Sequence, residues 1–275
     1  MIEVPLTWQL MKLGLSISMV LGLGAIAMRT SPRMAGLLAG YPLGTALALL
    51  FIGLEISPAF ATQSAVHTLA GFTATMALGA GYLVAGRKPG VKGIFGGVVG
   101  GLVAWLAVST LLAQFDFTRL SGTLVTLCAI AIFSGLFRSI PDVKSPASGA
   151  FSFPALAARA CLASVIIFTI TSLAHWLPPA WVGTMAAFPV TMLPFLLILH
   201  LSHGVAPVAT VIKHYPMGLG SLLSYTLCVS YTYSTLGLFW GTLAGFAAAT
   251  LWLLGWMQFT AWYQRRTTRT SACVG

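Results

Sequence analysis

The stretch from Pro32 to Gly71 occurs twice, and this repetition constrains the fold more than any other feature of the sequence. Adding 147 to each number aligns the two copies without a gap, and the matched residues are Pro32 and Pro179, Gly36 and Gly183, Pro42 and Pro189, Leu54 and Leu201, His67 and His214, and Gly71 and Gly218. Histidine is rare in this chain, with 5 of 275 residues, so a matched histidine is not expected by chance. The register persists to Trp105 and Trp252, and back to Lys12 and Arg159. We interpret the repetition as an internal duplication.

The composition places the chain in a membrane. Hydrophobic residues make up 58% and charged residues 7%, with only four acidic residues, so the chain cannot form the surface of a soluble domain. We therefore expect an all-α polytopic membrane protein. The net charge of +10 does not indicate nucleic-acid binding, because the basic residues fall singly or in short runs between apolar segments.

Nine apolar segments are long enough, or nearly so, to cross a bilayer as helices. They lie near residues 9–28, 35–57, 64–86, 93–114, 120–138, 156–177, 182–203, 215–234 and 238–262. With nine crossings, twelve of the fourteen lysines and arginines fall on one side, and only Lys12 and Arg119 fall on the other. The positive-inside rule then places the N-terminus outside and the C-terminus in the cytoplasm.

An odd number of crossings before the second copy gives the two copies opposite orientations. We expect a 4+1+4 arrangement: a first four-helix repeat in residues 1–115, a connecting helix and cytoplasmic linker in 116–155, and a second four-helix repeat with a basic cytoplasmic tail in 156–275. Inverted repeats of this kind are common in secondary transporters. They also arise when a small dual-topology protein fuses with its copy, whatever its function.

Prolines fall inside two equivalent predicted helices. Pro42 and Pro189 lie about seven residues into them, and Pro194 follows in the second. An interior proline removes a backbone hydrogen bond and kinks the helix, which exposes carbonyl groups that need a new partner in lipid. These kinks indicate either a central binding site or relief of tight packing.

Glu55 is the only acidic residue within an apolar segment. A carboxylate in this setting is costly, and by default it is a proton carrier, a cation ligand or the partner of a basic group. The alternative is an interfacial residue hydrated by water, because Pro58 follows three positions later. His67 is the expected partner, twelve residues on, and Ser202 replaces the acid in the second copy.

The second copy, which has Ser202 in place of Glu55, carries four basic residues close to this position: His200, His203, Lys213 and His214. We expect Glu55 and His67 to handle a proton or substrate charge on the outer side, and these four residues to do so on the cytoplasmic side. His200 and His203 lie one turn apart, but no third ligand is nearby in sequence, so we expect no metal site.

Lys12 and Arg159 occupy equivalent positions in the first turns of two apolar segments. Long cationic side chains at such positions normally extend to the membrane surface. The alternative is a symmetric pair of gating or anion-attracting residues, one at each membrane face.

The sequence lacks the motifs of an enzyme. It contains no HExxH, no GxSxG, no paired carboxylates and no acidic cluster for magnesium, and its four cysteines lack the spacing of a metal site. We therefore expect neither catalysis nor a cofactor.

Each half resembles the small four-helix inner-membrane proteins of the GlpM type, which are associated with alginate exopolysaccharide production in bacteria. The resemblance rests on Arg29, Ser31, Ala35-Gly36-Leu37, Pro42, Glu55 with Gly53, and Trp105, and in the second half on Gly183, Pro189 and Trp252. It covers about 100 residues in each half, and the second half lacks the acid. The resemblance implies the bacterial inner membrane and a link to export of cell-envelope carbohydrate.

Two hypotheses for the function follow. The first is a secondary transporter or flippase-like carrier for a small solute or a lipid-linked envelope precursor, with proton coupling through Glu55 as an option. The alternative is a non-transporting membrane subunit that supports exopolysaccharide or envelope assembly. The expected partners are membrane lipid and a small-molecule or lipid-linked substrate, together with a second copy of the chain or an envelope-assembly protein.

Overall fold

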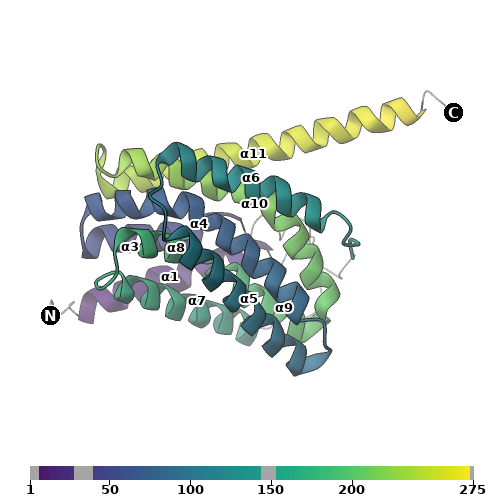
Figure 1. Cartoon of the computed structure of the whole chain (residues 1–275), viewed down its shortest axis with the longest axis horizontal. Coiled ribbons are helices and arrows are strands. Elements are labelled where there is room, and N and C mark those ends of the chain that lie inside the picture. The colour runs from purple at the N-terminus through teal and green to yellow at the C-terminus, as the bar shows by residue number, and fades with distance from the viewer. Residues whose placement is uncertain (1–5, 28–39, 144–152, 273–275) are drawn as a thin grey trace.

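The computed structural model describes residues 6–27, 40–143 and 153–272, and this part of the chain is helical without strands (Figure 1). Its helices are α1 (Leu6–Ala27), α3 (Leu43–Glu55), α4 (Pro58–Ala85), α5 (Gly90–Leu112), α6 (Arg119–Phe137), α7 (Phe153–Leu173), α8 (Pro179–Ala186), α9 (Met192–His203), α10 (Val205–Thr232) and α11 (Gly237–Ala272). Pro32, Gly36 and the basic residues Arg29, Arg33 and Lys144 lie outside the described residues.

Several predicted apolar segments coincide with a helix to within a few residues, and others differ. The segment predicted at 238–262 continues ten residues further, because α11 ends at Ala272, and the one predicted at 35–57 is described only from residue 40, with α3 beginning at Leu43. The segment predicted at 182–203 is divided into α8 and α9, with the residues from Ala187 to Thr191 not in a helix. The segment predicted at 215–234 begins ten residues earlier, because α10 starts at Val205. Lys213 and His214 therefore lie inside a helix, whereas the sequence placed Lys213 in the connection before it.

Local sequence explains several helix boundaries. Ser57 caps α4 by accepting a hydrogen bond from the backbone N–H of Phe60, and Pro58 occupies the first helical position, where no N–H is needed. Thr118 and Ser121 form a capping box at the start of α6. Gly204 has a φ of 79°, and this left-handed conformation allows α9 to end and α10 to begin one residue later.

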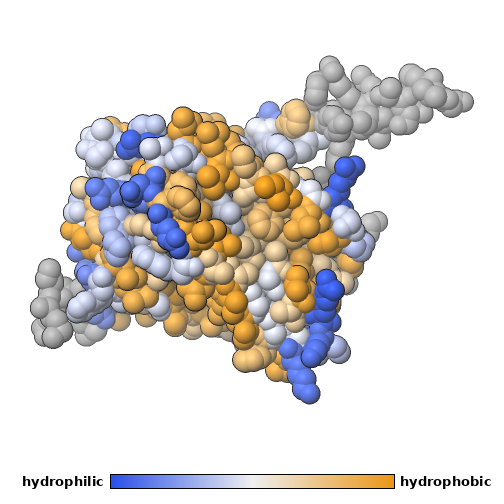
Figure 2. All heavy atoms as spheres, in the orientation of Figure 1, coloured by the Kyte–Doolittle hydropathy of each residue, from blue (hydrophilic) through white to orange (hydrophobic). Residues whose placement is uncertain are grey.

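Four helices are long and apolar enough to cross a membrane, by length and composition: α4, α5, α6 and the Gly237–Thr260 part of α11. On α5, α6 and α11, large hydrophobic side chains such as Phe95, Ile132 and Leu251 are exposed. Figure 2 shows hydrophobic side chains over much of the visible face, with hydrophilic side chains gathered toward its left and right. These surfaces are compatible with a membrane protein, because in water they would be unfavourably hydrated.

The centre of the molecule is formed by α4 and α10, which contact each other. Helix α4 also packs against α3, α5, α6 and α8, while α10 packs against α6, α9 and α11. Two close backbone approaches bring the central helices against the residues that precede α3 and α9. A Cβ atom on Gly40 would lie 2.3 Å from the backbone carbon of Gly218, and one on Gly71 would lie 2.9 Å from Cβ of Ala187.

Helix boundaries recur at the spacing found in the sequence. Adding 147 to both bounds of α4 gives the bounds of α10, and adding it to the start of α5 gives the start of α11. Helices α1 and α7 start at the same spacing and end within one residue of it. The same spacing relates the two close approaches. Gly40 corresponds to Ala187 and Gly71 to Gly218, so the pair Gly40–Gly218 maps onto the pair Ala187–Gly71.

Candidate functional site

The predicted polar residues lie in groups at opposite ends of the helix bundle. Helix α3 ends at Glu55 on the left of Figure 1, which we call the Glu55 end, and α9 ends at His203 on the right, which we call the His203 end. Lys12, near the start of α1, contacts Thr171, near the end of α7, so these two helices run antiparallel. Arg159, near the start of α7, accordingly lies toward the His203 end.

Glu55 forms a buried ion pair with Lys12. The Lys12 Nζ atom lies 2.5 Å from Oε1 of Glu55, and the two side chains are each only 6% exposed. Lys12 also donates a hydrogen bond of 2.5 Å to the hydroxyl of Thr171, and His175 Nε2 lies 3.4 Å from the second carboxylate oxygen. The expectation that Lys12 extends to the membrane surface is therefore wrong: its side chain is directed into the protein, where a carboxylate compensates its charge.

Two aromatic rings enclose the ammonium group of Lys12. Its Nζ atom lies 5.4 Å from the ring centre of Phe51 and 4.9 Å from that of Phe168. Cation–π contacts of this kind stabilise a desolvated cation. The sequence contained one signal for this pair, which was the presence of one cation and one carboxylate in separate apolar segments.

His67 was expected to face Glu55, and the structure gives both residues other neighbours. The imidazole of His67 packs edge-on against Phe117, with the ring centres 6.3 Å apart. The histidine within ion-pair distance of Glu55 is His175, which the sequence analysis did not single out. His175 follows the last residue of α7, and only the packing of α7 against α3 brings it there.

The two histidines of α9 have different surroundings. His200 is buried, and its Nδ1 atom lies 2.9 Å from the hydroxyl of Tyr82 on α4. Nδ1 of His203 is buried without a hydrogen-bond partner among the described residues. No group of three metal-ligating side chains occurs in the described part of the chain, and the three cysteines described there are free thiols.

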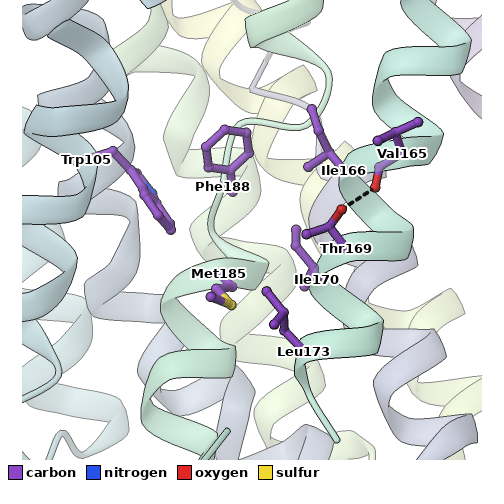
Figure 3. A pocket seen from close by; sticks show the side chains of 8 residues that line it. All are labelled: Trp105, Val165, Ile166, Thr169, Ile170, Leu173, Met185 and Phe188. Carbon is purple, nitrogen blue, oxygen red and sulfur yellow. Dashed lines mark hydrogen bonds between the residues drawn. The ribbon is translucent and has the colours of Figure 1, made fainter. Parts of the chain in front are cut away.

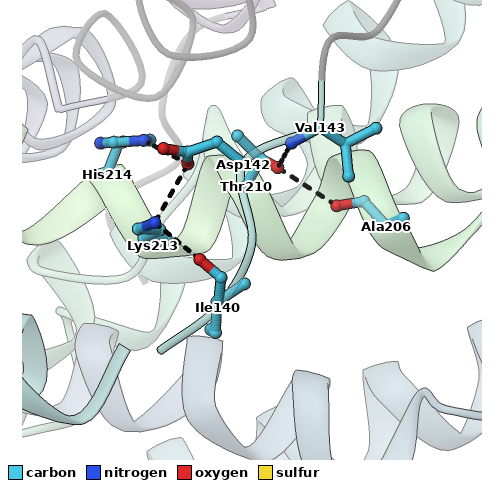
Figure 4. A network of polar contacts seen from close by, with 7 residues as sticks. All are labelled: Ile140, Asp142, Val143, Ala206, Thr210, Lys213 and His214. Carbon is cyan, nitrogen blue, oxygen red and sulfur yellow. Dashed lines mark hydrogen bonds and ion pairs between the residues drawn. The ribbon is translucent and has the colours of Figure 1, made fainter. Parts of the chain in front are cut away.

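Lys213 and His214 hold the chain that follows α6 (Figure 4). Nε2 of His214 lies 2.9 Å from Oδ1 of Asp142, and Lys213 Nζ lies 3.3 Å from the same oxygen while donating to the carbonyl of Ile140 at 2.6 Å. The hydrogen bond from His214, followed by the one from Lys213, holds the pKa of Asp142 below its usual value. These residues therefore fasten the start of the linker onto α10.

Two of the three prolines lie outside the described helices, and the question whether a helix precedes Pro42 falls on residues outside the described part of the chain. Pro42 immediately precedes α3, and Pro189 lies in the non-helical stretch between α8 and α9. Pro194 produces no further break, because it occupies the first turn of α9, where a missing N–H is tolerated. Thr75 on α4 donates a 2.5 Å hydrogen bond to the carbonyl of Ala187, and this satisfies a backbone group freed at the interruption.

The start of α3 and the non-helical stretch before α9 face each other around a cavity of about 10 Å³, roughly the space of one water molecule. Its lining consists of Tyr41, Gly44, Thr45, Ala187, Phe188, Pro189, Val190, Thr191, Tyr215 and Leu222. The first turns of α3 and α9 both border it, and a Cβ atom on Gly44 would lie 2.7 Å from Cβ of Val190. The meeting point of the start of α3 with the stretch between α8 and α9 is thus closely packed.

A second cavity, of about 240 Å³, lies between α5, α7 and α8 (Figure 3). Trp105 and Phe188 lie on one side of it, edge to face with their ring centres 5.1 Å apart, and apolar side chains of α7 lie on the other. The indole nitrogen of Trp105 is buried without a partner among the described residues. The cavity is suited to an apolar group, since its lining is almost entirely hydrocarbon.

Arg159 is buried, with only 4% of its surface exposed. Its guanidinium carbon lies 5.0 Å from the ring centre of Phe195, in the first turn of α9. Its Nε atom has no hydrogen-bond partner, and no ion pair with Arg159 occurs among the described residues. This cation, like Lys12, is directed inward, contrary to expectation, but it lacks the carboxylate that Lys12 has.

Comparison of the chain with protein-family models, curated proteins and solved structures found no match.

Proposed function

We propose that the protein is a secondary transporter with two inverted four-helix repeats joined by α6. In this arrangement α8 and α9 form one broken crossing of nine. The recurrence of helix boundaries at a spacing of 147 supports it, as does the exchange of the Gly40–Gly218 contact with the Gly71–Ala187 contact. Contacts that map onto one another in this way are expected when two repeats are related by a pseudo-two-fold axis.

The observation that carries the proposal is the meeting of the start of α3 with the interruption between α8 and α9 around one small cavity. Transporters built from inverted repeats commonly bind their cargo where discontinuous helices meet, because the broken helix ends offer unpaired backbone groups. Here the start of α3 and the interruption before α9 share the cavity bordered by Gly44 and Val190. Its small volume corresponds to a closed conformation, which must open to one side at a time to admit a solute.

Proton coupling is assigned to the Lys12–Glu55 pair and His175. A carboxylate that alternates between a buried ammonium group and a proton can link proton movement to a change of conformation. Replacing both Lys12 and Glu55 by glutamine removes the two charges together, so neither remains buried alone. We expect this double variant to lose the pH dependence of flux, whereas Asp116→Asn, which removes a carboxylate from the α5–α6 connection, should retain it.

The proposed setting is the bacterial inner membrane, with the N-terminus outside and the C-terminus in the cytoplasm. The Glu55 end then faces outward, and the Asp142 contact to α10 lies on the cytoplasmic side. The distribution of lysine and arginine between the two sides supports this orientation. The cargo is a small solute or a lipid-linked envelope precursor.

One observation favours the alternative, a non-transporting subunit of an envelope-assembly complex. The crossing of the interrupted helices is packed so closely that it leaves only about 10 Å³, as expected of a scaffold. The resemblance of each half to GlpM-type proteins points the same way. This alternative predicts a stable protein partner, or a second copy of the chain, that co-purifies in a fixed ratio.

A disulfide cross-link between α3 and the stretch before α9 distinguishes the two proposed functions. In a cysteine-free background, Gly44→Cys and Val190→Cys place Cβ atoms close enough for a disulfide after a small adjustment. Currents are recorded from proteoliposomes on a solid support while amino acids, sugars, organic anions and isoprenoid phosphates are supplied. We expect oxidation to abolish the solute-driven current and a reductant to restore it.

The matched control is the pair Leu69→Cys and Gly122→Cys, which joins α4 to α6 away from the crossing. Its current should survive oxidation. Full current through the oxidised Gly44–Val190 pair would refute alternating access at this crossing. An absence of current for every solute, together with a partner retained in a fixed ratio, would establish the scaffold in place of the transporter.

A further inference from the structure

Arg159 carries a buried positive charge that no acidic residue in the described part of the chain balances. Guanidinium keeps its proton under all ordinary conditions, so burial cannot neutralise Arg159 as it can neutralise a lysine or a carboxylic acid. A buried charge without a counter-ion is strongly unfavourable. The ring of Phe195, 5.0 Å away, offsets only a small part of that cost.

The chain has few acids that could serve as the counter-ion. It contains four acidic residues, and two are engaged elsewhere, Glu55 with Lys12 and Asp142 with His214. Asp116 lies in the connection between α5 and α6, which is at the Glu55 end, and Glu3 lies outside the described residues. At the position that corresponds to Glu55, the second repeat has Ser202. The carboxylate that balances Lys12 in one half is thus replaced by a neutral residue in the other.

The surroundings of Arg159 add further positive potential. Phe195 belongs to the first turn of α9, and helical side chains lean toward the N-terminus of their helix, so the guanidinium lies near the start of α9. Helix N-termini carry a partial positive charge and unpaired N–H groups. Thr191, which caps α9, forms no side-chain hydrogen bond to the helix. The N–H of Leu193 is bonded to the carbonyl of Pro189 and Pro194 has no N–H, so this terminus adds positive potential mainly through the helix dipole. The buried guanidinium and the helix dipole therefore both favour negative charge in the same region.

We propose that Arg159 and the first turn of α9 form a binding site for a small oxyanion, a carboxylate or a phosphate. The planar guanidinium presents two parallel N–H groups that match the spacing of two oxygens in either ligand. The anion supplies the negative charge that no described acidic residue supplies to Arg159. The site differs from the Lys12–Glu55 pair, and it does not depend on whether the protein transports its ligand. The oxyanion is either a free solute or the headgroup of a lipid, which share this chemistry.

The test uses the full-length protein purified in detergent, with chloride as the background anion at constant ionic strength. Melting temperature is measured while succinate or inorganic phosphate replaces chloride. We expect a saturable rise of about 5–10 °C at a concentration 100 times Kd. The rise should disappear in Arg159→Gln and persist in part in Arg159→Lys. It should be unchanged in Arg119→Gln, because Arg119 is already bonded to the carbonyl of Ser230.

A second arm identifies a lipid source. Native mass spectrometry of the protein with phosphatidylglycerol should show bound lipid in the wild type and its loss in Arg159→Gln, if the oxyanion is a headgroup. A response to succinate or phosphate alone identifies a free solute. Equal behaviour of the wild type and Arg159→Gln in both arms would overturn the proposal.

A third measurement needs no ligand. In chloride alone, Arg159→Gln should melt at the same temperature as the wild type or above it, because the substitution removes an uncompensated charge. A fall as large as that caused by Lys12→Gln would mean that the chain balances Arg159 internally, and the proposal would be wrong. This comparison keeps the test decisive even if no added anion binds tightly.

Discussion

The Lys12–Glu55 pair provides the sharpest test of how the described helices are held together. At 2.5 Å, two unit charges attract by about 7 kcal/mol at an effective dielectric constant of about 20. Desolvation of each charge costs several kcal/mol, so the pair as a whole contributes little. Removal of one partner leaves the other buried alone, and this costs about 3–5 kcal/mol.

We therefore expect Lys12→Gln and Glu55→Gln each to lower the free energy of unfolding by about 3–5 kcal/mol, and the double variant to be more stable than either single variant. Unfolding of the detergent-solubilised protein with SDS, followed by intrinsic tryptophan fluorescence, gives the three values. The interaction energy should be at least about 2 kcal/mol. Simple addition of the two losses in the double variant would refute a buried ion pair.

A matched cycle on two charges that form no ion pair with each other is the control for this measurement. Asp116→Asn and Arg119→Gln remove an acid and a base near the start of α6, where Arg119 is bonded to the end of α10 and not to the acid. These two changes should add to within about 0.5 kcal/mol. Strong coupling there would show that the method reports detergent or net-charge effects and not the contact at Glu55.

Two further predictions concern the linker and the central crossing. Asp142→Asn should lower stability by up to about 1 kcal/mol, since the carboxylate is partly screened by solvent. Because His214 lowers the pKa of Asp142 in the folded state, the difference from wild type is full at pH 7 and fades as the pH falls below about 4. Gly40→Ala should cost about 1–3 kcal/mol by collision with Gly218, whereas Gly14→Ala, with open space around it, should not destabilise. Thermal unfolding of the wild type and Asp142→Asn across pH checks the first expectation. A melting temperature of Gly40→Ala equal to that of the wild type would contradict the second.

Apolar length and composition were enough to locate most helices. The segments expected at 64–86, 93–114 and 120–138 correspond to α4, α5 and α6, because backbone groups in an apolar environment must be satisfied within the helix itself. Proline chemistry located the interruption near Pro189 for a similar reason, since proline supplies no N–H, and α3 begins directly after Pro42. The extra ten residues at the start of α10 were missed, because Lys213 and His214 are typical of a loop until Asp142 is found to bind them.

The sequence by itself determined the helical class, the spacing of 147 and the two proline positions. These features depend on local chemistry, namely hydrogen-bond satisfaction and the identity of aligned residues. Only the tertiary structure decided that Glu55 pairs with Lys12 and approaches His175, while His67 packs on Phe117. It also left Arg159 without an acidic partner among the described residues. Charges interact strongly only when they lie within a few ångströms of each other. The packing of the helices decides which charges come that close, and separation along the chain does not predict it.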